Sequence, residues 1–72
     1  MELTASEKIR ILANRRGASM ADIADLTGQS RQNLSNKLKR DNFSVVELQK
    51  LAAALNCSVS ICFIDNENGE SI

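Results

Sequence analysis

The chain has 72 residues, no net charge and an apolar content of 43%, but only 3% of its residues are aromatic. A domain typically needs roughly 100–150 residues, so a second domain is excluded. A domain of this size buries only about 60% of its unfolded surface, so burial against another copy would add stability. The chain contains no His, the side chain that most often moves protons near neutral pH and binds metals. The sequence therefore predicts a protein that is not an enzyme, with no cofactor and no metal site.

No run approaches the roughly 18 apolar residues that a membrane span needs. The first residues, Met1 to Glu7, also lack the basic and apolar regions of a secretion signal. These features predict a cytoplasmic protein with no membrane partner. Cys57 and Cys62 lie five positions apart in an expected strand, on opposite faces and about 16 Å apart, too far for a disulfide. Both are interpreted as small apolar side chains.

The charges are divided between the two halves of the chain. Residues 1–40 contain eight basic and four acidic residues, a net charge of +4, whereas residues 41–72 contain one basic and five acidic residues, a net charge of −4. The first half would attract a polyanion and the second half would repel it. A neutral total therefore does not exclude nucleic acid as a partner.

Three capping boxes predict where helices begin, because the hydroxyl and the acidic side chain each satisfy a free backbone N–H of the first turn. The boxes are Thr4…Glu7, Ser19…Asp22 and Ser44…Glu47. The expected ends of these helices are Gly17, Thr27-Gly28 and Asn56. Their apolar stripes include Ile9, Leu12 and Ala13, then Met20, Ile23, Ala24 and Leu26, then Leu48, Leu51, Ala52 and Leu55. Phe43 is expected to pack on Leu48 as a hydrophobic staple.

A more polar helix is expected over residues 30–40. Its only strong apolar residues are Leu34 and Leu38, so one narrow stripe can face a core while the other sides remain polar or basic. Together with the short helix before it and the turn at Gly28, this is the layout of a helix-turn-helix. Gly28 supplies the positive φ that the turn requires.

The hydrophobic period changes after Asn56. Residues 57–64 alternate in character and are rich in β-branched side chains, which predicts a strand. Residues 65–72 are polar with an Asn68-Gly69 turn signal, and the sequence leaves open a turn into a short second strand or a frayed tail. The fold expected is one mainly α domain over residues 1–72: a core of four to five helices over 1–56, then the strand or short hairpin.

At this point the sequence resembles the Cro/CI-like family of bacterial and phage repressors, also called XRE-like, over residues 5–56. The resemblance rests on Ile23-Ala24 four residues before Gly28, on Ser30-Arg31-Gln32-Asn33-Leu34-Ser35 as recognition helix, and on Leu48 through Asn56 as closing helix. The sequence departs from the family at Met20, where an amide side chain usually contacts a phosphate, and at Thr27 and Gln29, which are usually apolar. The second apolar anchor is Leu38 instead of the preceding position, so a slightly rotated recognition helix is expected.

The resemblance implies that the recognition helix enters the major groove of double-stranded DNA. The expected base contacts are Arg31, Gln32, Ser35 and Asn36, since Arg matches O6 and N7 of G and Gln matches N6 and N7 of A. The expected phosphate contacts are Ser19, Ser30, Lys37, Lys39 and Arg40. For Lys39-Arg40, and for the further candidates Arg15-Arg16, a second role stays open, because basic pairs in a last helical turn also complement the helix dipole.

A single strand exposes unpaired N–H and C=O groups on both edges and invites pairing. The same strand of a second copy is the expected partner, with Val59, Ile61 and Phe63 in the dimer interface. Such a homodimer would place two recognition helices about 34 Å apart, as a palindromic operator requires. The sequence therefore predicts a DNA-binding transcriptional regulator of the repressor kind. The alternative is a small protein-interaction or antitoxin-like module whose strand binds another protein.

Overall fold

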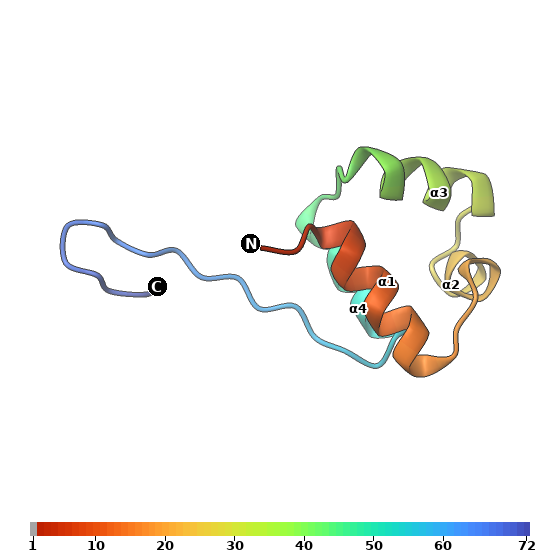
Figure 1. The fold of residues 1–72 in the computed structure, drawn as a ribbon, viewed down its shortest axis with the longest axis horizontal. Helices are drawn as coiled ribbons and strands as arrows, with labels where there is room; N and C mark the ends of the chain where they lie inside the picture. The colour runs from red at the N-terminus through yellow and green to blue at the C-terminus, as the bar shows by residue number, and fades with distance from the viewer. Residues whose placement is uncertain (1) are drawn as a thin grey trace.

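The computed structural model describes residues 2–72 and contains four α-helices in that range (Figure 1). They are α1 (Ala5–Arg16), α2 (Met20–Leu26), α3 (Arg31–Arg40) and α4 (Val45–Ala54). The helices form one body, and residues 57–72, here called the arm, extend away from it (Figure 1). The molecule is therefore elongated, with extents of 44 × 23 × 23 Å. None of the helices within residues 2–72 is long and apolar enough to cross a membrane.

The helices begin and end where local chemistry directs them. All three predicted capping boxes are confirmed, with the Thr4, Ser19 and Ser44 hydroxyls each accepting from a backbone N–H at 3.1 Å. The left-handed conformations predicted for Gly17, Gly28 and Asn56 are also confirmed, with φ values of 63°, 68° and 56°. These positions terminate α1, form the turn before α3 and follow α4, so local signals set the boundaries of the helices.

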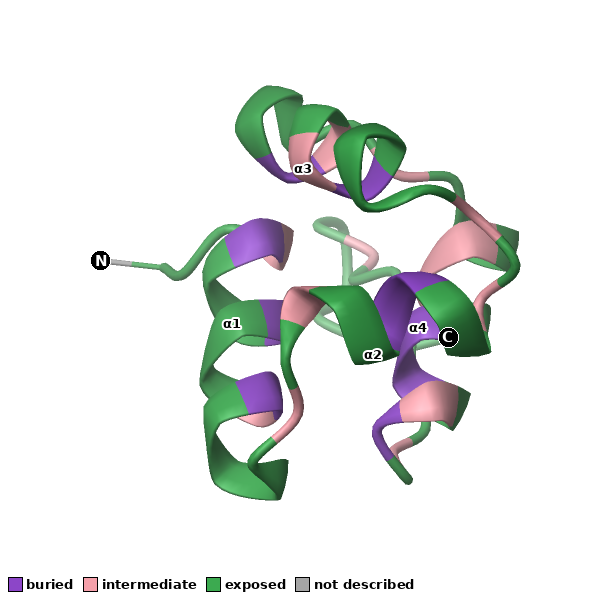
Figure 2. Ribbon diagram, turned by 90° about the vertical axis from the view of Figure 1, so that its right-hand side faces the viewer, coloured by how far each residue is buried: buried purple, intermediate pink, exposed green. Residues whose placement is uncertain are grey.

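The core lies where the four helices face one another (Figure 2). Its largest fully buried side chains are Ile23 from α2, Leu34 from α3, and Leu51 and Leu55 at the end of the chain's helical part. The other buried members of this cluster are Ile9, Ala13, Ala24 and Leu38. The two predicted staple residues, Phe43 and Leu48, are half-buried against it. The core is built from aliphatic side chains and is small, in keeping with the short chain and its low aromatic content.

A polar contact closes the body between the start of α1 and the end of α3. The buried Ser6 hydroxyl lies 2.7 Å from the Leu38 carbonyl oxygen and donates to it, and the Ser6 backbone N–H donates to Asp41 Oδ1 at 2.9 Å. Asp41 itself has a left-handed backbone, with a φ of 51°, and terminates α3. The carboxylate of Asp41 thus satisfies a free N–H of the first turn of α1 and complements that helix dipole.

The strand expected over residues 57–64 is absent from the described chain. One isolated antiparallel bridge joins Ile64 to Ser71, and Phe63 and Ile72 exchange backbone hydrogen bonds of 2.9 and 2.8 Å. Residues 65–72 therefore form the turn that returns to Ile72, not a frayed tail. The returning segment is too short to pair with residues 57–62, and a strand without a neighbouring strand cannot form a ladder.

We expect Ser44→Ala to destabilise the protein by roughly 0.5–2 kcal/mol, because the cap of α4 loses the hydroxyl that accepts the Glu47 N–H. Urea unfolding followed by far-UV circular dichroism measures this change. Ser60→Ala, in the exposed part of the arm, is the control and should unfold as the wild type does. Equal unfolding midpoints for Ser44→Ala and the wild type would show that the cap contributes nothing.

Candidate nucleic-acid interface

The helix α3 is attached to the body along one side only (Figure 2). Leu34 and Leu38 are 0% and 4% exposed, whereas Ser35 and Lys37 are half-buried. The exposed side chains of α3 are Arg31, Gln32, Asn33, Asn36, Lys39 and Arg40. The outer side of this helix is therefore polar and basic and open to solvent, as the narrow apolar stripe predicted.

Two amide side chains are coupled on the outer side of α3. Gln32 Nε2 donates to Asn36 Oδ1 at 3.2 Å, across one turn of the helix. The Gln32 carbonyl oxygen and the Asn36 amide nitrogen keep acceptor and donor capacity for a further partner. With the exposed Arg31 beside them, these groups offer the hydrogen-bonding pattern that base edges require. Ser35 is the least accessible of the four expected base contacts, since it is half-buried.

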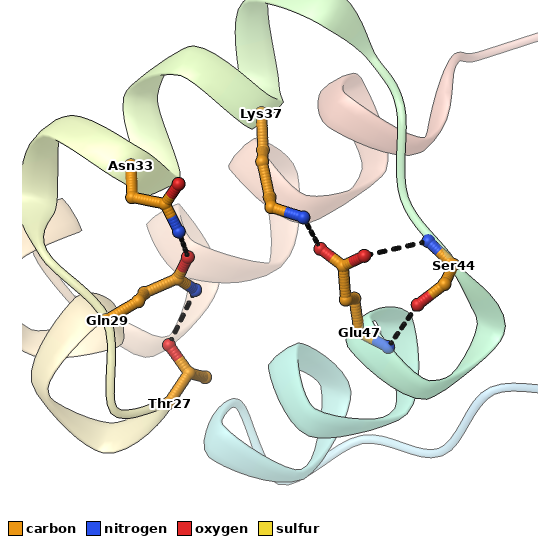
Figure 3. Close-up of polar contacts among 6 residues, drawn as sticks. All are labelled: Thr27, Gln29, Asn33, Lys37, Ser44 and Glu47. Atoms are coloured by element: carbon orange, nitrogen blue, oxygen red, sulfur yellow. Dashed lines mark hydrogen bonds and ion pairs between the residues drawn. The ribbon is translucent and has the colours of Figure 1, made fainter.

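A chain of side-chain hydrogen bonds joins α3 to the turn before it (Figure 3). Asn33 Nδ2 donates to Gln29 Oε1 at 2.9 Å, and Gln29 Nε2 donates to Thr27 Oγ1 at 2.8 Å. The Thr27 hydroxyl donates in turn to the Ile23 carbonyl oxygen at 2.7 Å, near the end of α2. The polar residues at positions 27 and 29 thus join the two helices by directed bonds.

Lys37 pairs with Glu47 across α3 and α4 (Figure 3). The same carboxylate accepts the Ser44 backbone N–H at 3.3 Å through its other oxygen. The hydrogen bond from Lys37 and then that from the Ser44 backbone hold the pKa of Glu47 below its ordinary value. The charge of Lys37 is therefore partly balanced inside the protein, which weakens it as a phosphate contact.

The other cations of α3 are differently placed. Within residues 2–72 Lys37–Glu47 is the one ion pair, so Arg31, Lys39 and Arg40 have no carboxylate partner there. All three are exposed. Lys39 and Arg40 lie in the last turn and complement the helix dipole, and that role leaves their charged groups accessible to an anion.

The two serines expected at phosphates stand at unlike helix starts. Ser19 begins α2, where Asp22 Oδ2 already accepts the Ser19 backbone N–H at 3.1 Å. The hydrogen bonds from the Ser19 backbone and side chain lower the pKa of Asp22, so its carboxylate stays negatively charged to a lower pH than usual. Ser30 begins α3, whose first turn contains no acidic residue. Electrostatics therefore favour Ser30 over Ser19 as an anion contact.

Arg16 has a structural role at the end of α4. Its Nε donates to the Leu55 carbonyl oxygen at 2.9 Å, and its Nη2 lies 3.8 Å from Cys57 Sγ. The guanidinium thus satisfies a carbonyl that the helix leaves unpaired and connects the arm to α1. Its neighbour Arg15 is exposed.

Comparisons with known proteins agree with this arrangement. The family model of the Cro/C1-type helix-turn-helix DNA-binding domain matches residues 8–60, which include all of α2, α3 and α4. The chain belongs to this family. The family expected from the sequence is therefore confirmed. The Cro/C1-type family is one of DNA-binding regulators, not of enzymes. In this Cro/C1-type domain α2, the turn at Gly28 and α3 form the helix-turn-helix unit.

A curated relative carries a functional name. The competence pilus inhibition repressor of Acinetobacter baylyi (strain ATCC 33305 / BD413 / ADP1) is 40% identical over 62 residues, which cover 83% of this chain and 56% of that protein. The chain thus spans little more than half the length of that relative. No solved structure matches the chain.

Two features of this Cro/C1-type domain were not expected from the sequence. The first is the Asn33–Gln29–Thr27 chain, for which the four-residue spacing of Gln29 and Asn33 was an available signal. The second is the Lys37–Glu47 pair. It joins residues on two different helices, so no local sequence pattern indicates it. Both features hold α3 at its inner edge, so they affect how its outer side is presented.

We expect Glu47→Gln to reduce the pH dependence of stability. Because the pKa of Glu47 is lowered in the folded protein, its carboxylate stabilises the fold above its unfolded pKa, and this contribution is lost as the pH falls through its folded pKa. Glutamine keeps the bond to Ser44 but removes the charge that pairs with Lys37. Urea unfolding between about pH 7 and about pH 3 should show a wild-type advantage at neutral pH that shrinks in acid.

The matched control for this experiment is Glu2→Gln, before α1, an exposed carboxylate that has no ion pair in the described chain. Its unfolding free energy should follow that of the wild type throughout the pH range. If Glu47→Gln and Glu2→Gln changed the unfolding free energy alike at every pH, the contact of Glu47 with Lys37 would contribute nothing to stability.

Proposed function

We propose that this protein is a sequence-specific transcriptional repressor that binds a palindromic operator in double-stranded DNA as a homodimer. The observation that carries the proposal is the polar, basic outer side of α3 in a chain of the Cro/C1-type DNA-binding family. The Acinetobacter relative, which is named a repressor, supports repression as the mode of regulation. A regulator of this kind works in the cytoplasm, where bacterial DNA lies, and needs no cofactor.

Sequence is read by Arg31, Gln32 and Asn36 in this proposal, with Ser35 at the edge of the contact. Support comes from the exposure of the first three and from the Gln32–Asn36 bond, which restricts both amides before DNA is bound. A restricted side chain loses less conformational entropy when it binds. Arg31 has no such restraint from a carboxylate in the described residues and offers its guanidinium to G.

The phosphate backbone is held by Ser30, Lys39 and Arg40, with smaller contributions from Ser19 and Lys37. The ranking follows from charge. Ser19 is next to the Asp22 carboxylate and Lys37 is paired with Glu47, whereas the first three have no acidic group bonded to them in residues 2–72. These contacts position α3 and carry no sequence information.

The homodimer uses the arm in this proposal. Ile61 and Phe63 are exposed and Val59 is half-buried, and the backbone of residues 57–62 has no ladder partner within the described chain. Burial of these side chains against a second copy removes apolar surface from water and relates two α3 helices by a two-fold axis. Two symmetry-related reading helices match a palindromic site.

The direct test is selection of bound DNA from a random duplex pool, followed by sequencing. We expect a consensus with inverted half-sites whose centres are about one DNA turn apart. Enrichment of a single asymmetric site would contradict the homodimer. Absence of any enrichment, with affinity equal for all duplexes, would contradict sequence-specific regulation.

We expect Arg31→Ala and Gln32→Ala each to reduce affinity for the selected operator by about 1–3 kcal/mol and to leave binding to unrelated DNA almost unchanged. Each removes contacts to a base edge. Lys39→Ala should instead weaken binding to both DNAs alike and reduce the salt dependence, since it removes one neutralised phosphate. Fluorescence anisotropy titrations at several salt concentrations measure both effects.

The structure provides a control on α3 itself. Lys37→Ala removes the same charge as Lys39→Ala, but from a lysine that Glu47 balances, so its effect on the salt dependence should be smaller. An unchanged operator preference after Arg31→Ala would show that α3 does not read the bases. Equal salt effects of the two lysine variants would show that Glu47 does not balance Lys37.

A further inference from the structure

The end of the arm exposes several large apolar side chains together. Phe63, Ile64 and Ile72 are 75%, 62% and 77% exposed, and the backbone hydrogen bonds between Phe63 and Ile72 hold the ends of this hairpin side by side. We call residues 63–72 the arm tip. Apolar groups that cluster on a surface, unlike scattered ones, are typical of an interaction site. The apolar side chains of the arm tip are therefore exposed to water in a single copy, as those of an unoccupied interaction site would be.

The body of the same chain has an apolar groove. It has a volume of about 360 Å³ and lies between α1, α4 and the first residues of the arm. Its apolar lining includes Ile9, Leu12, Leu48, Ala52 and Leu55. None of the residues that line it comes from α2 or α3. An occupant of this groove would thus leave the outer side of α3 free.

The charges of the arm tip and of the groove are complementary. The arm tip contains Asp65, Glu67 and Glu70 and no basic residue. Lys8 lines the groove and is exposed. Arg15, seven residues further along α1, shares that helix face and is exposed too. An acidic, apolar hairpin is therefore suited to a groove with an apolar floor and a basic rim.

The arm tip does not occupy the groove of its own chain. Residues 57–61 line that groove, and the residues that follow extend away from the body (Figure 1). To enter the same groove, the tip would have to reverse direction directly after the segment that lines it. A second copy presents the same groove without this constraint, because its body can be placed at the end of the arm.

We infer that the arm tip of one copy docks in the α1/α4 groove of a second copy, and that the second arm does the same in return. The inference rests on the proposed homodimer and specifies its contact surfaces. A two-fold axis makes both contacts identical, so one arm and one groove per chain bury two apolar patches. The occupant is Phe63 with Ile72, its hydrogen-bonded neighbour across the hairpin, while the acidic side chains of the tip face Lys8 and Arg15.

The first test is sedimentation equilibrium of the full chain. Phe63→Ser should raise the dimer dissociation constant by roughly tenfold or more, since a large apolar side chain leaves the interface. Leu26→Ser is the matched control, because Leu26 is 68% exposed on α2 and outside the groove. It should dimerise as the wild type does. Circular dichroism should be unchanged in both variants, since neither side chain belongs to the core.

The second test identifies the surface that Phe63 contacts. In a mixed sample of ¹³C-labelled and unlabelled chains, isotope-filtered NOE spectra should connect the Phe63 ring of one copy to Leu12, Leu48 or Ala52 methyl groups of the other. Contacts only between the arms of the two copies would overturn the groove as the docking site. A chain that remains monomeric at all concentrations would also overturn it, and if that monomer still preferred the selected operator sequence, the proposed DNA-binding function would stand.

Discussion

Two buried leucines hold the exposed helix α3 in the molecule. Leu34 and Leu38 are the only residues of α3 that enter the core, where they meet Ile23 of α2 and Leu51 and Leu55 at the end of the helical part. Because aliphatic contacts are not directional, two of them on one stripe attach the helix firmly but restrict its rotation about its own axis only weakly. The outer side of α3 depends on that rotation, so the molecule needs further restraints.

Polar contacts supply those restraints at three levels along α3. At its beginning Asn33 is joined through Gln29 to the turn; at its middle Lys37 is paired with Glu47 of α4; at its end the Leu38 carbonyl accepts the Ser6 hydroxyl. Hydrogen bonds and ion pairs are directional and fix the angle that the leucines leave free. All three involve the inner edge or an end of the helix, which leaves Gln32, Asn36 and the terminal cations available for a ligand.

The separation of charge along the sequence becomes a separation in space. The helical body carries the basic excess and the arm carries only acidic charge, and the arm extends away from the body (Figure 1). An acidic segment kept at a distance from α3 reduces its repulsion of a polyanion, because interactions between exposed charges are screened beyond about 8–10 Å in physiological salt. The chain therefore combines a neutral total charge with a basic surface around α3.

The sequence by itself determined the features that depend on near neighbours. Capping boxes, left-handed glycines and the spacing of aliphatic residues act within one or two turns, so the four helices, the turn at Gly28 and the accessible face of α3 could all be predicted. The family also followed from these features. The strand expected over residues 57–64 is not confirmed in the single chain, because alternating side chains indicate that these residues suit a sheet but do not supply the neighbouring strand that a ladder requires.

Only the tertiary structure decided the contacts between distant residues. Ser6 and Asp41 are 35 positions apart and Arg16 and Leu55 are 39 positions apart, and no periodicity or motif relates either pair. The same holds for Lys37 and Glu47, ten positions apart on two helices. These contacts exist because the aliphatic core brings the helices side by side, and a local sequence pattern does not show which helices will meet. Packing, not residue type, therefore decided that Arg16 donates to the Leu55 carbonyl at the end of α4 and that Lys37 pairs with Glu47.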